Sequence, residues 1–205
     1  MNTTTLIAFN DLTHEQAGAA LAQVGALIGN HRDSLRGLGV DIDDAQFTSE
    51  IRVLPGKYAP GSRGQLILAK SGTRVLGCIA LRAIDLPGHK PGTACEIKRL
   101  FVAHEARGAG LGLMLVRRIQ DEAVALGYDY AALDTLHRLP HAEALYRLEG
   151  FVDIPRYNDN SMPDIVFLGK ALRAEPRAVA QAASAYLLLS TPIIPPEAPH
   201  GIATS

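Results

Sequence analysis

The feature of this 205-residue sequence that most constrains its fold is a glycine-rich turn between an expected strand and an expected helix. The strand is CEIKRLFV (95–102), the turn spans residues 107–112, and a helical apolar periodicity then runs to Gly127. Glycines let the backbone approach a ligand closely, and the amides at a helix N-terminus carry the positive end of its dipole. The turn is therefore suited to binding phosphate, and Arg107 adds a cation at its mouth.

Two common phosphate-binding motifs do not fit this turn. The dinucleotide pattern G-x-G-x-x-G would need its third glycine at Leu113 or Leu115. The P-loop pattern fails at both Gly-Lys pairs, 56–57 and 169–170, because the required glycine and Ser/Thr are missing there. The remaining alternative is that the glycines only permit a tight strand-to-helix turn.

The order of expected elements predicts an α+β fold, because strands and helices do not alternate strictly. Helices are expected after Asn10 or Thr13, near 43–53, from 111 to 126 and over 140–149. The segment 29–63 shows no clear pattern apart from the helix near 43–53. Strands are expected over 3–9, 65–70, 74–83, 95–102, 128–136, 151–155 and 164–172.

The composition changes after Leu172, which divides the chain. We expect one domain over residues 1–172 and an Ala/Pro-rich tail over 173–205, partly disordered, with a short helix near 177–190. The alternative for the tail is a role in oligomer contacts.

Charge and composition argue against several classes of partner. Twenty basic and 21 acidic residues nearly cancel, and aromatic residues make up only 5%. We therefore expect no nucleic-acid partner and no membrane partner. Two cysteines form no disulfide framework, and the N-terminus does not resemble a signal peptide, so we expect a cytoplasmic protein. His137 and His141 have no third ligand nearby, so no metal site is expected.

The turn resembles motif A of the GCN5-related N-acetyltransferases, the GNAT superfamily. Their signature, Arg/Gln-x-x-Gly-x-Gly/Ala, is matched by Arg107, Gly110 and Gly112, and ALYRLEGF (144–151) resembles a second family segment. The likeness covers roughly residues 3–172 and implies a single GNAT fold, with a mixed, mostly antiparallel sheet flanked by helices. CEIKRLFV and LDTL (133–136) resemble a bacterial subgroup, some members of which are fused to MarR-type domains.

This resemblance implies acetyl-CoA as the cosubstrate. Backbone groups of Leu100, Phe101 and Val102 would bind the pantetheine arm and polarise the thioester carbonyl. Many GNAT sequences have asparagine at the position of Leu139, so this chain departs from the family pattern at one pantetheine contact. The amides that would bind the pyrophosphate belong to the turn residues Arg107, Gly108, Ala109, Gly110, Leu111 and Gly112.

Two residues match family positions for proton transfer. Glu96 lies eleven residues before Arg107, as the catalytic glutamate of histone-type members does. It is expected to act as a general base or through a water relay, and the alternative is a salt bridge to Lys98 or Arg99. Tyr146 matches the tyrosine that protonates the leaving thiolate, and the alternative is packing of its helix.

Lys98 and Arg99 are expected beside the acceptor, where they would hold a substrate carboxylate or form a solvated strand edge. The resemblance implies an N-acetyltransferase acting on the primary amine of a small molecule, such as an amino acid, by direct transfer in a ternary complex. The alternatives are a non-catalytic acyl-CoA-binding regulatory module and a protein or peptide N-acetyltransferase. GNAT proteins are often dimers, so a homodimer is also considered.

Overall fold

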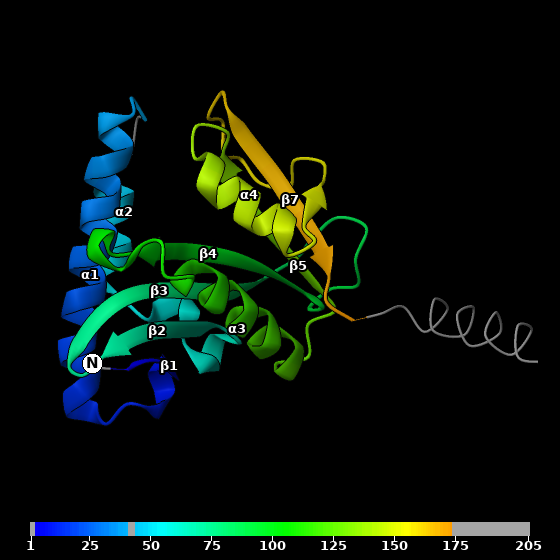
Figure 1. Cartoon of the computed structure of the whole chain (residues 1–205). Helices are drawn as coiled ribbons and strands as arrows, with labels where there is room; N and C mark the ends of the chain where they lie inside the picture. The colour runs from blue at the N-terminus through cyan, green and yellow to red at the C-terminus, as the bar shows by residue number, and fades with distance from the viewer. Residues whose placement is uncertain (1–2, 41–43, 174–205) are drawn as a thin grey trace, which may run out of the picture. The chain divides into compact units, whose positions relative to one another are not determined.

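The structure is a computed structural model that describes residues 3–40 and 44–173. These residues form a seven-stranded sheet in the order β1-β2-β3-β4-β5-β7-β6, flanked by helices (Figure 1). The helices are α1 (His14–Gly37), α2 (Asp44–Arg52), α3 (Leu111–Ala125) and α4 (Pro140–Leu148). The strands are β1 (Thr4–Ala8), β2 (Gln65–Ser71), β3 (Arg74–Ile84), β4 (Ala94–Val102), β5 (Tyr130–Leu136), β6 (Val152–Asp153) and β7 (Ile165–Ala171).

The sheet is mixed but mostly antiparallel, as predicted. Every neighbouring pair is antiparallel except β4 and β5, which run parallel. The β2–β3 hairpin turns at Ser71–Arg74, where the sequence predicted it. The predictions for β1 and β7 are one residue too long at each end, and that for β5 starts at 128 rather than Tyr130. The prediction for β6 covers five residues, but only two pair with β7, at Gly169 and Leu168.

The first helix begins after Thr13, one of the two predicted caps, and ends later than the sequence indicated. Thr13 caps α1, with its side chain accepting from the Gln16 backbone and the Gln16 side chain accepting from the Thr13 backbone. The helix continues through Gly29 to Gly37, across a segment whose pattern we could not interpret. Val24 and Ile28 are buried against the sheet, and this packing outweighs the low helix propensity of glycine.

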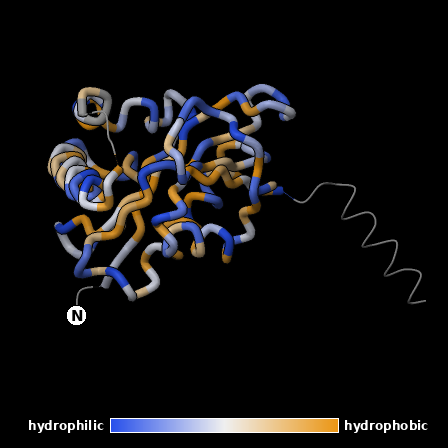
Figure 2. Tube along the Cα trace, turned by 90° about the horizontal axis from the view of Figure 1, so that it is seen from above, coloured by the Kyte–Doolittle hydropathy of each residue, from blue (hydrophilic) through white to orange (hydrophobic). Residues whose placement is uncertain are grey.

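The two faces of the sheet carry separate apolar cores. On one face, α3 and α4 cover a core that contains Ile119, Leu133 and Tyr146. On the other face, α1 covers a core that contains Val24 and Phe101. Figure 2 shows the hydrophobic segments concentrated in the interior strands and on the inner sides of the helices. This layering confirms the predicted α+β fold. Because helices cover both faces of the sheet, a site can form where strands separate.

The parallel strands β4 and β5 separate after a short contact. They pair only from Ala94↔Tyr130 to Glu96↔Ala132, and Figure 1 shows them diverging beyond that point. A bulge follows in β4, where Arg99 has a φ of 59°. The divergence leaves one edge of β4 without a strand neighbour, so its backbone N–H and C=O groups can bind a ligand.

The tail predicted over 173–205, with its helix near 177–190, lies outside the described residues except for Arg173. Within the described part of the chain, no helix is both long and apolar enough to cross a membrane. The same residues contain no group of three or more His, Cys, Asp or Glu that could hold a metal ion.

Candidate active site

The glycine turn leads into the N-terminus of α3, as predicted. Gly108 and Gly110 have φ values of 79° and 75°, a region that residues with a Cβ rarely adopt. Gly110 is the N-cap of α3, no side chain caps it, and the first turn carries no acidic residue. The first backbone N–H groups of α3 therefore have no partner within the helix and are suited to bind an anion.

Arg107 lies between this turn and β4. Its Nε donates a hydrogen bond to the carbonyl of Val102 at 3.1 Å, and its guanidinium lies 5.9 Å from the centroid of the Phe101 ring. Arg107 thus links the turn to the end of the free β4 edge. This brings the predicted pyrophosphate residues next to the predicted pantetheine residues.

A groove of about 250 Å³ lies where β4 and β5 diverge. From β4 it is lined by residues 97–101, which include the predicted Leu100 and Phe101, and from β5 by residues 134–136. Leu139, which replaces the asparagine of many GNAT sequences, also lines it. An apolar channel with a free strand edge fits a linear chain that carries amide groups, because the strand can pair with those amides.

Tyr146 of α4 lines the same groove. Its side chain is 5% exposed, and its ring packs edge-on against Phe151 with centroids 5.8 Å apart. Burial, followed by the negative charge of Asp134, raises the pKa of the Tyr146 phenol above its usual value. The phenol is therefore protonated at neutral pH and can donate a proton. The ring also packs in the core, which was the alternative considered for this residue.

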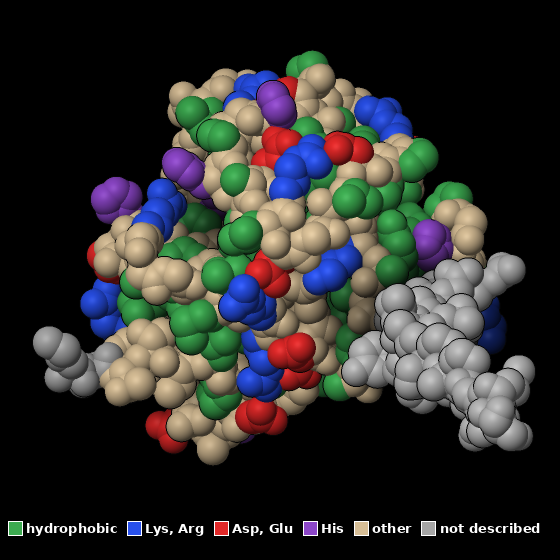
Figure 3. Space-filling view, turned by 45° about the vertical axis from the view of Figure 1, so that its right-hand side comes forward, with side chains coloured by type: hydrophobic (Ala, Val, Ile, Leu, Met, Phe, Trp, Pro, Cys, Tyr) green, Lys and Arg blue, Asp and Glu red, His purple; other side chains and the backbone are tan. Residues whose placement is uncertain are grey.

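A second, larger cavity of about 770 Å³ adjoins the groove. Its lining mixes charges of both signs: Glu50, Lys57, Arg82, Lys98, Arg99, Asp134, Arg138, Asp159 and Asp164. On the molecular face shown in Figure 3, basic and acidic side chains likewise lie interspersed, in keeping with the near-zero net charge. Lys98, Arg99 and Asp134 line both spaces, so the two meet at these residues.

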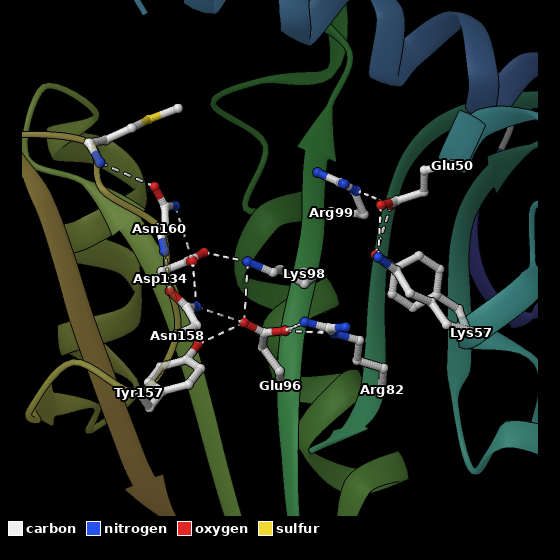
Figure 4. Close-up of polar contacts among 12 residues, drawn as sticks. Glu50, Lys57, Arg82, Glu96, Lys98, Arg99, Asp134, Tyr157, Asn158 and Asn160 are labelled. Carbon is white, nitrogen blue, oxygen red and sulfur yellow. Dashed lines mark hydrogen bonds and ion pairs between the residues drawn. The ribbon is translucent and has the colours of Figure 1, made fainter. Parts of the chain in front are cut away.

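Glu96 lies beneath this junction (Figure 4). Its side chain is fully buried, and it lines neither of the two cavities. Its Oε2 accepts from Arg82 at 2.6 Å. Its Oε1 accepts from Tyr157 at 2.9 Å and lies 3.2 Å from the Lys98 ammonium. The predicted ion pair of Glu96 with Lys98 is therefore present. The second cation at Glu96 is Arg82, because Arg99 pairs with Glu50 instead.

Lys98 and Arg99 are both held by carboxylates. Lys98 Nζ lies 2.5 Å from Oδ1 of Asp134, and Arg99 Nε lies 2.6 Å from Oε1 of Glu50 (Figure 4). They line the cavity as predicted, but they do not form a solvated strand edge, since their side chains are only 21% and 28% exposed. An acceptor carboxylate would have to share these cations with Asp134 and Glu50.

Sequence reasoning missed Asp134 as a site residue. Its side chain is 9% exposed, and of the described carboxylates it alone lines both spaces. Its Oδ2 accepts from Asn158 at 3.0 Å and from Asn160 at 3.3 Å. Burial raises its pKa, but Lys98 and the two asparagines outweigh this and lower it. The signal was a lone acidic residue within an otherwise apolar strand, YAALDTL.

His31 of α1 also lines the groove, opposite the end of β4. Its ring centroid lies 5.3 Å from that of Phe101. Burial, and then the positive charges of Arg99 and Arg107, lower the pKa of His31. The imidazole is therefore neutral at neutral pH and adds a polar ring to the wall of the groove.

The diverging parallel strands, the free β4 edge and the uncapped helix N-terminus define an acyl-CoA N-acyltransferase fold. The Acetyltransferase (GNAT) family model matches residues 41–151, more than half of the chain. An uncharacterised N-acetyltransferase from Schizosaccharomyces pombe is 33% identical over 137 residues, which cover 67% of this chain and 81% of the relative. The chain therefore belongs to the acetyltransferase (GNAT) family.

Solved structures show the same fold. An acetyltransferase from Streptococcus agalactiae has a TM-score of 0.65 at 24% identity, covering 83% of this chain and 99% of that one. A Salmonella typhimurium protein solved with its cofactor acetyl-CoA has a TM-score of 0.60 at 14% identity, covering 85% and 97%. The predicted fold and the predicted enzyme class, an N-acetyltransferase, are confirmed.

Proposed function

We propose that this protein transfers an acetyl group from acetyl-CoA to the primary amine of a small polar molecule, such as an amino acid. The observation that carries the proposal is the junction at Asp134 and Lys98, where an apolar groove meets a polar cavity. A donor in the groove and an acceptor in the cavity would meet there, which favours direct transfer in a ternary complex.

The residues of the turn and of β4 fit acetyl-CoA. Residues 107–112 would hold the pyrophosphate at the N-terminus of α3, and Leu100–Val102 would bind the pantetheine amides along the free strand edge. When bound, acetyl-CoA supplies an activated thioester, from which an amine can take the acetyl group. The family match and the acetyl-CoA-bound neighbour support this assignment.

Two carboxylates are available to the acceptor amine. Asp134 lies at the junction, and its Oδ1, which Lys98 contacts, has a second lone pair that can accept an N–H from the amine. Glu96 lines neither cavity and contacts the site through Arg82, Lys98 and Asn158, which line the larger one. We therefore give Asp134 the direct contact with the amine, and the water relay predicted for Glu96 stays a prediction.

Tyr146 is suited to protonate the departing thiolate. A tyrosine phenol is protonated at neutral pH, and this one lines the groove in which the thioester would lie. The amine would lose its proton beside Asp134, and the sulfur would gain a proton from Tyr146. With two side chains, neither has to act first as base and then as acid.

Several narrower predictions stay predictions. These are the bacterial subgroup related to MarR fusions, the cytoplasmic location, the homodimer and the division into 1–172 and 173–205. The S. pombe relative is eukaryotic, so the likeness extends beyond bacteria.

The test is turnover of a panel of amines. The purified protein would receive acetyl-CoA with amino acids, diamines or amino sugars, each at millimolar concentration, while released thiol is measured. We expect amine-dependent thiol release and an acetylated amine detected by mass spectrometry. A folded protein that binds acetyl-CoA but acetylates none of these amines would favour the non-catalytic module.

A further inference from the structure

The bulge in β4 places one residue in an unfavourable backbone conformation. Cys78 pairs with Phe101 and Ala80 pairs with Lys98, so β4 uses three residue steps where β3 uses two. Within the extra step, Arg99 has a φ of 59°. A residue with a Cβ is disfavoured there, so another interaction must hold Arg99 in place.

That interaction comes from α2 (Figure 4). Oε1 of Glu50 accepts from Arg99 Nε at 2.6 Å and from the Tyr58 hydroxyl at 2.9 Å, while Oε2 accepts from Lys57 at 2.8 Å. Burial raises the pKa of Glu50, but Arg99 and then Lys57 outweigh it and hold that pKa at about 2. Glu50 is therefore ionised at neutral pH, and its side chain is only 15% exposed.

The bulge determines which way the rest of β4 faces. Side chains alternate along a strand, so loss of one residue from the bulge would turn residues 100–102 over. In the structure, Phe101 packs in the core beneath α1, whereas Leu100 and Val102 pack against the core beneath α3. The backbone N–H and C=O groups alternate with the side chains, so the bulge also fixes which of them point into the groove.

We propose that Glu50, through its ion pair with Arg99, positions the stretch of β4 backbone that receives acetyl-CoA. The inference rests on the proposed function, because it takes acetyl-CoA as the ligand of the groove. Arg99 is in this sense a positioning residue, since its side chain holds the bulge that orients residues 100–102. Glu50 also lines the acceptor cavity, so α2 connects the acceptor side of the site to the cofactor side.

Two substitutions of Arg99 separate the role of its backbone from that of its side chain. Arg99→Ala and Arg99→Gly both remove the guanidinium, but only glycine adopts the observed φ without a steric cost. Calorimetric titration is expected to show about fivefold weaker acetyl-CoA binding for Arg99→Ala than for Arg99→Gly. Glu50→Gln is expected to weaken binding as well. Asp129→Asn, which alters a carboxylate paired with Arg173, serves as the matched control.

A second ligand distinguishes this role from a general loss of structure. An adenosine bisphosphate without pantetheine can bind the turn but not the groove, so its affinity should be the same in all variants. Weaker acetyl-CoA binding with unchanged nucleotide binding supports the proposal. Equal acetyl-CoA affinities for the two Arg99 variants, or parallel loss of both ligands, would overturn it. A wild-type protein that binds neither ligand contradicts the proposed function instead.

Discussion

Lys98 joins two carboxylates that differ in exposure, and this difference can be tested at the residue scale. Asp134 faces both cavities, whereas Glu96 is buried beneath them. Asp134→Asn keeps the shape of the side chain but removes the charge that meets the acceptor amine. We expect amine turnover to fall roughly hundredfold, with unchanged acetyl-CoA affinity by calorimetry. Wild-type turnover in this variant would remove Asp134 from the mechanism.

Glu96→Gln is the matched comparison for this prediction. It removes the buried charge that faces Arg82 and Lys98, so we expect a loss of roughly 3 kcal/mol in the free energy of unfolding. Urea denaturation measures this directly. Asp134→Asn should cost less, because Asp134 faces one cation, Lys98, beside two neutral asparagines, whereas Glu96 faces two cations.

Tyr146 can be tested for its role as the acid. Tyr146→Phe keeps the ring contact with Phe151 and removes the donor, so we expect roughly hundredfold slower turnover with little change in melting temperature. The raised pKa of the phenol adds a pH prediction, because the acid form persists above the usual value of about 10. The wild-type rate should therefore not decline as pH rises towards that value. If the rate declines at a pH well below about 10, a group other than Tyr146 causes that decline.

At the scale of elements, the start of α1 depends on a single cap. The side chain of Thr13 accepts from the backbone N–H of Gln16, the third residue of the helix, and the side chain of Gln16 accepts from the backbone N–H of Thr13. Thr13→Ala is expected to lower the free energy of unfolding by about 1 kcal/mol. Chemical denaturation would show this as a lower midpoint with an unchanged slope. No change would mean that packing against the sheet, rather than the cap, determines the stability of this helix.

Local patterns were sufficient to predict most elements. The hairpin, the glycine turn with α3, and α4 each depend on residues close together in sequence, and the structure has all of them. The length of α1 and the bulge at Arg99 depend on packing against the sheet, which local sequence does not encode.

The residues of the site likewise fall into those that local motifs predict and those that require the fold. The turn at 107–112 and Tyr146 follow from motifs of contiguous residues. Asp134 and Glu50 become site residues only because Lys98 and Arg99 lie beside them, 36 and 49 residues away in sequence. Their roles therefore require the fold, although the acidic residue within an apolar strand was a usable signal.

At the scale of the whole molecule, the segment between β6 and β7 contributes residues 158–164 to the lining of the larger cavity. Tyr157 donates to Glu96, and Asn158 donates to Asp134, so buried carboxylates hold this segment together with the packing of Tyr157 on Phe167. Tyr157→Phe combined with Asn158→Ala is expected to cost about 2 kcal/mol in total. Hydrogen exchange should accelerate most in residues 155–163. Equal acceleration throughout the sheet would show that these bonds stabilise the whole fold.

The central claim is that the turn after β4 binds acetyl-CoA. Calorimetric titration of the wild-type protein with acetyl-CoA, beside an Arg107→Glu/Gly110→Asp double variant, tests it most directly. Negative charge placed at the helix N-terminus opposes the pyrophosphate, and aspartate tolerates the left-handed backbone of Gly110. We predict micromolar binding by the wild type and none by the variant, with both folded by circular dichroism. Absence of binding by the folded wild type, or equal binding by the variant, would contradict the account.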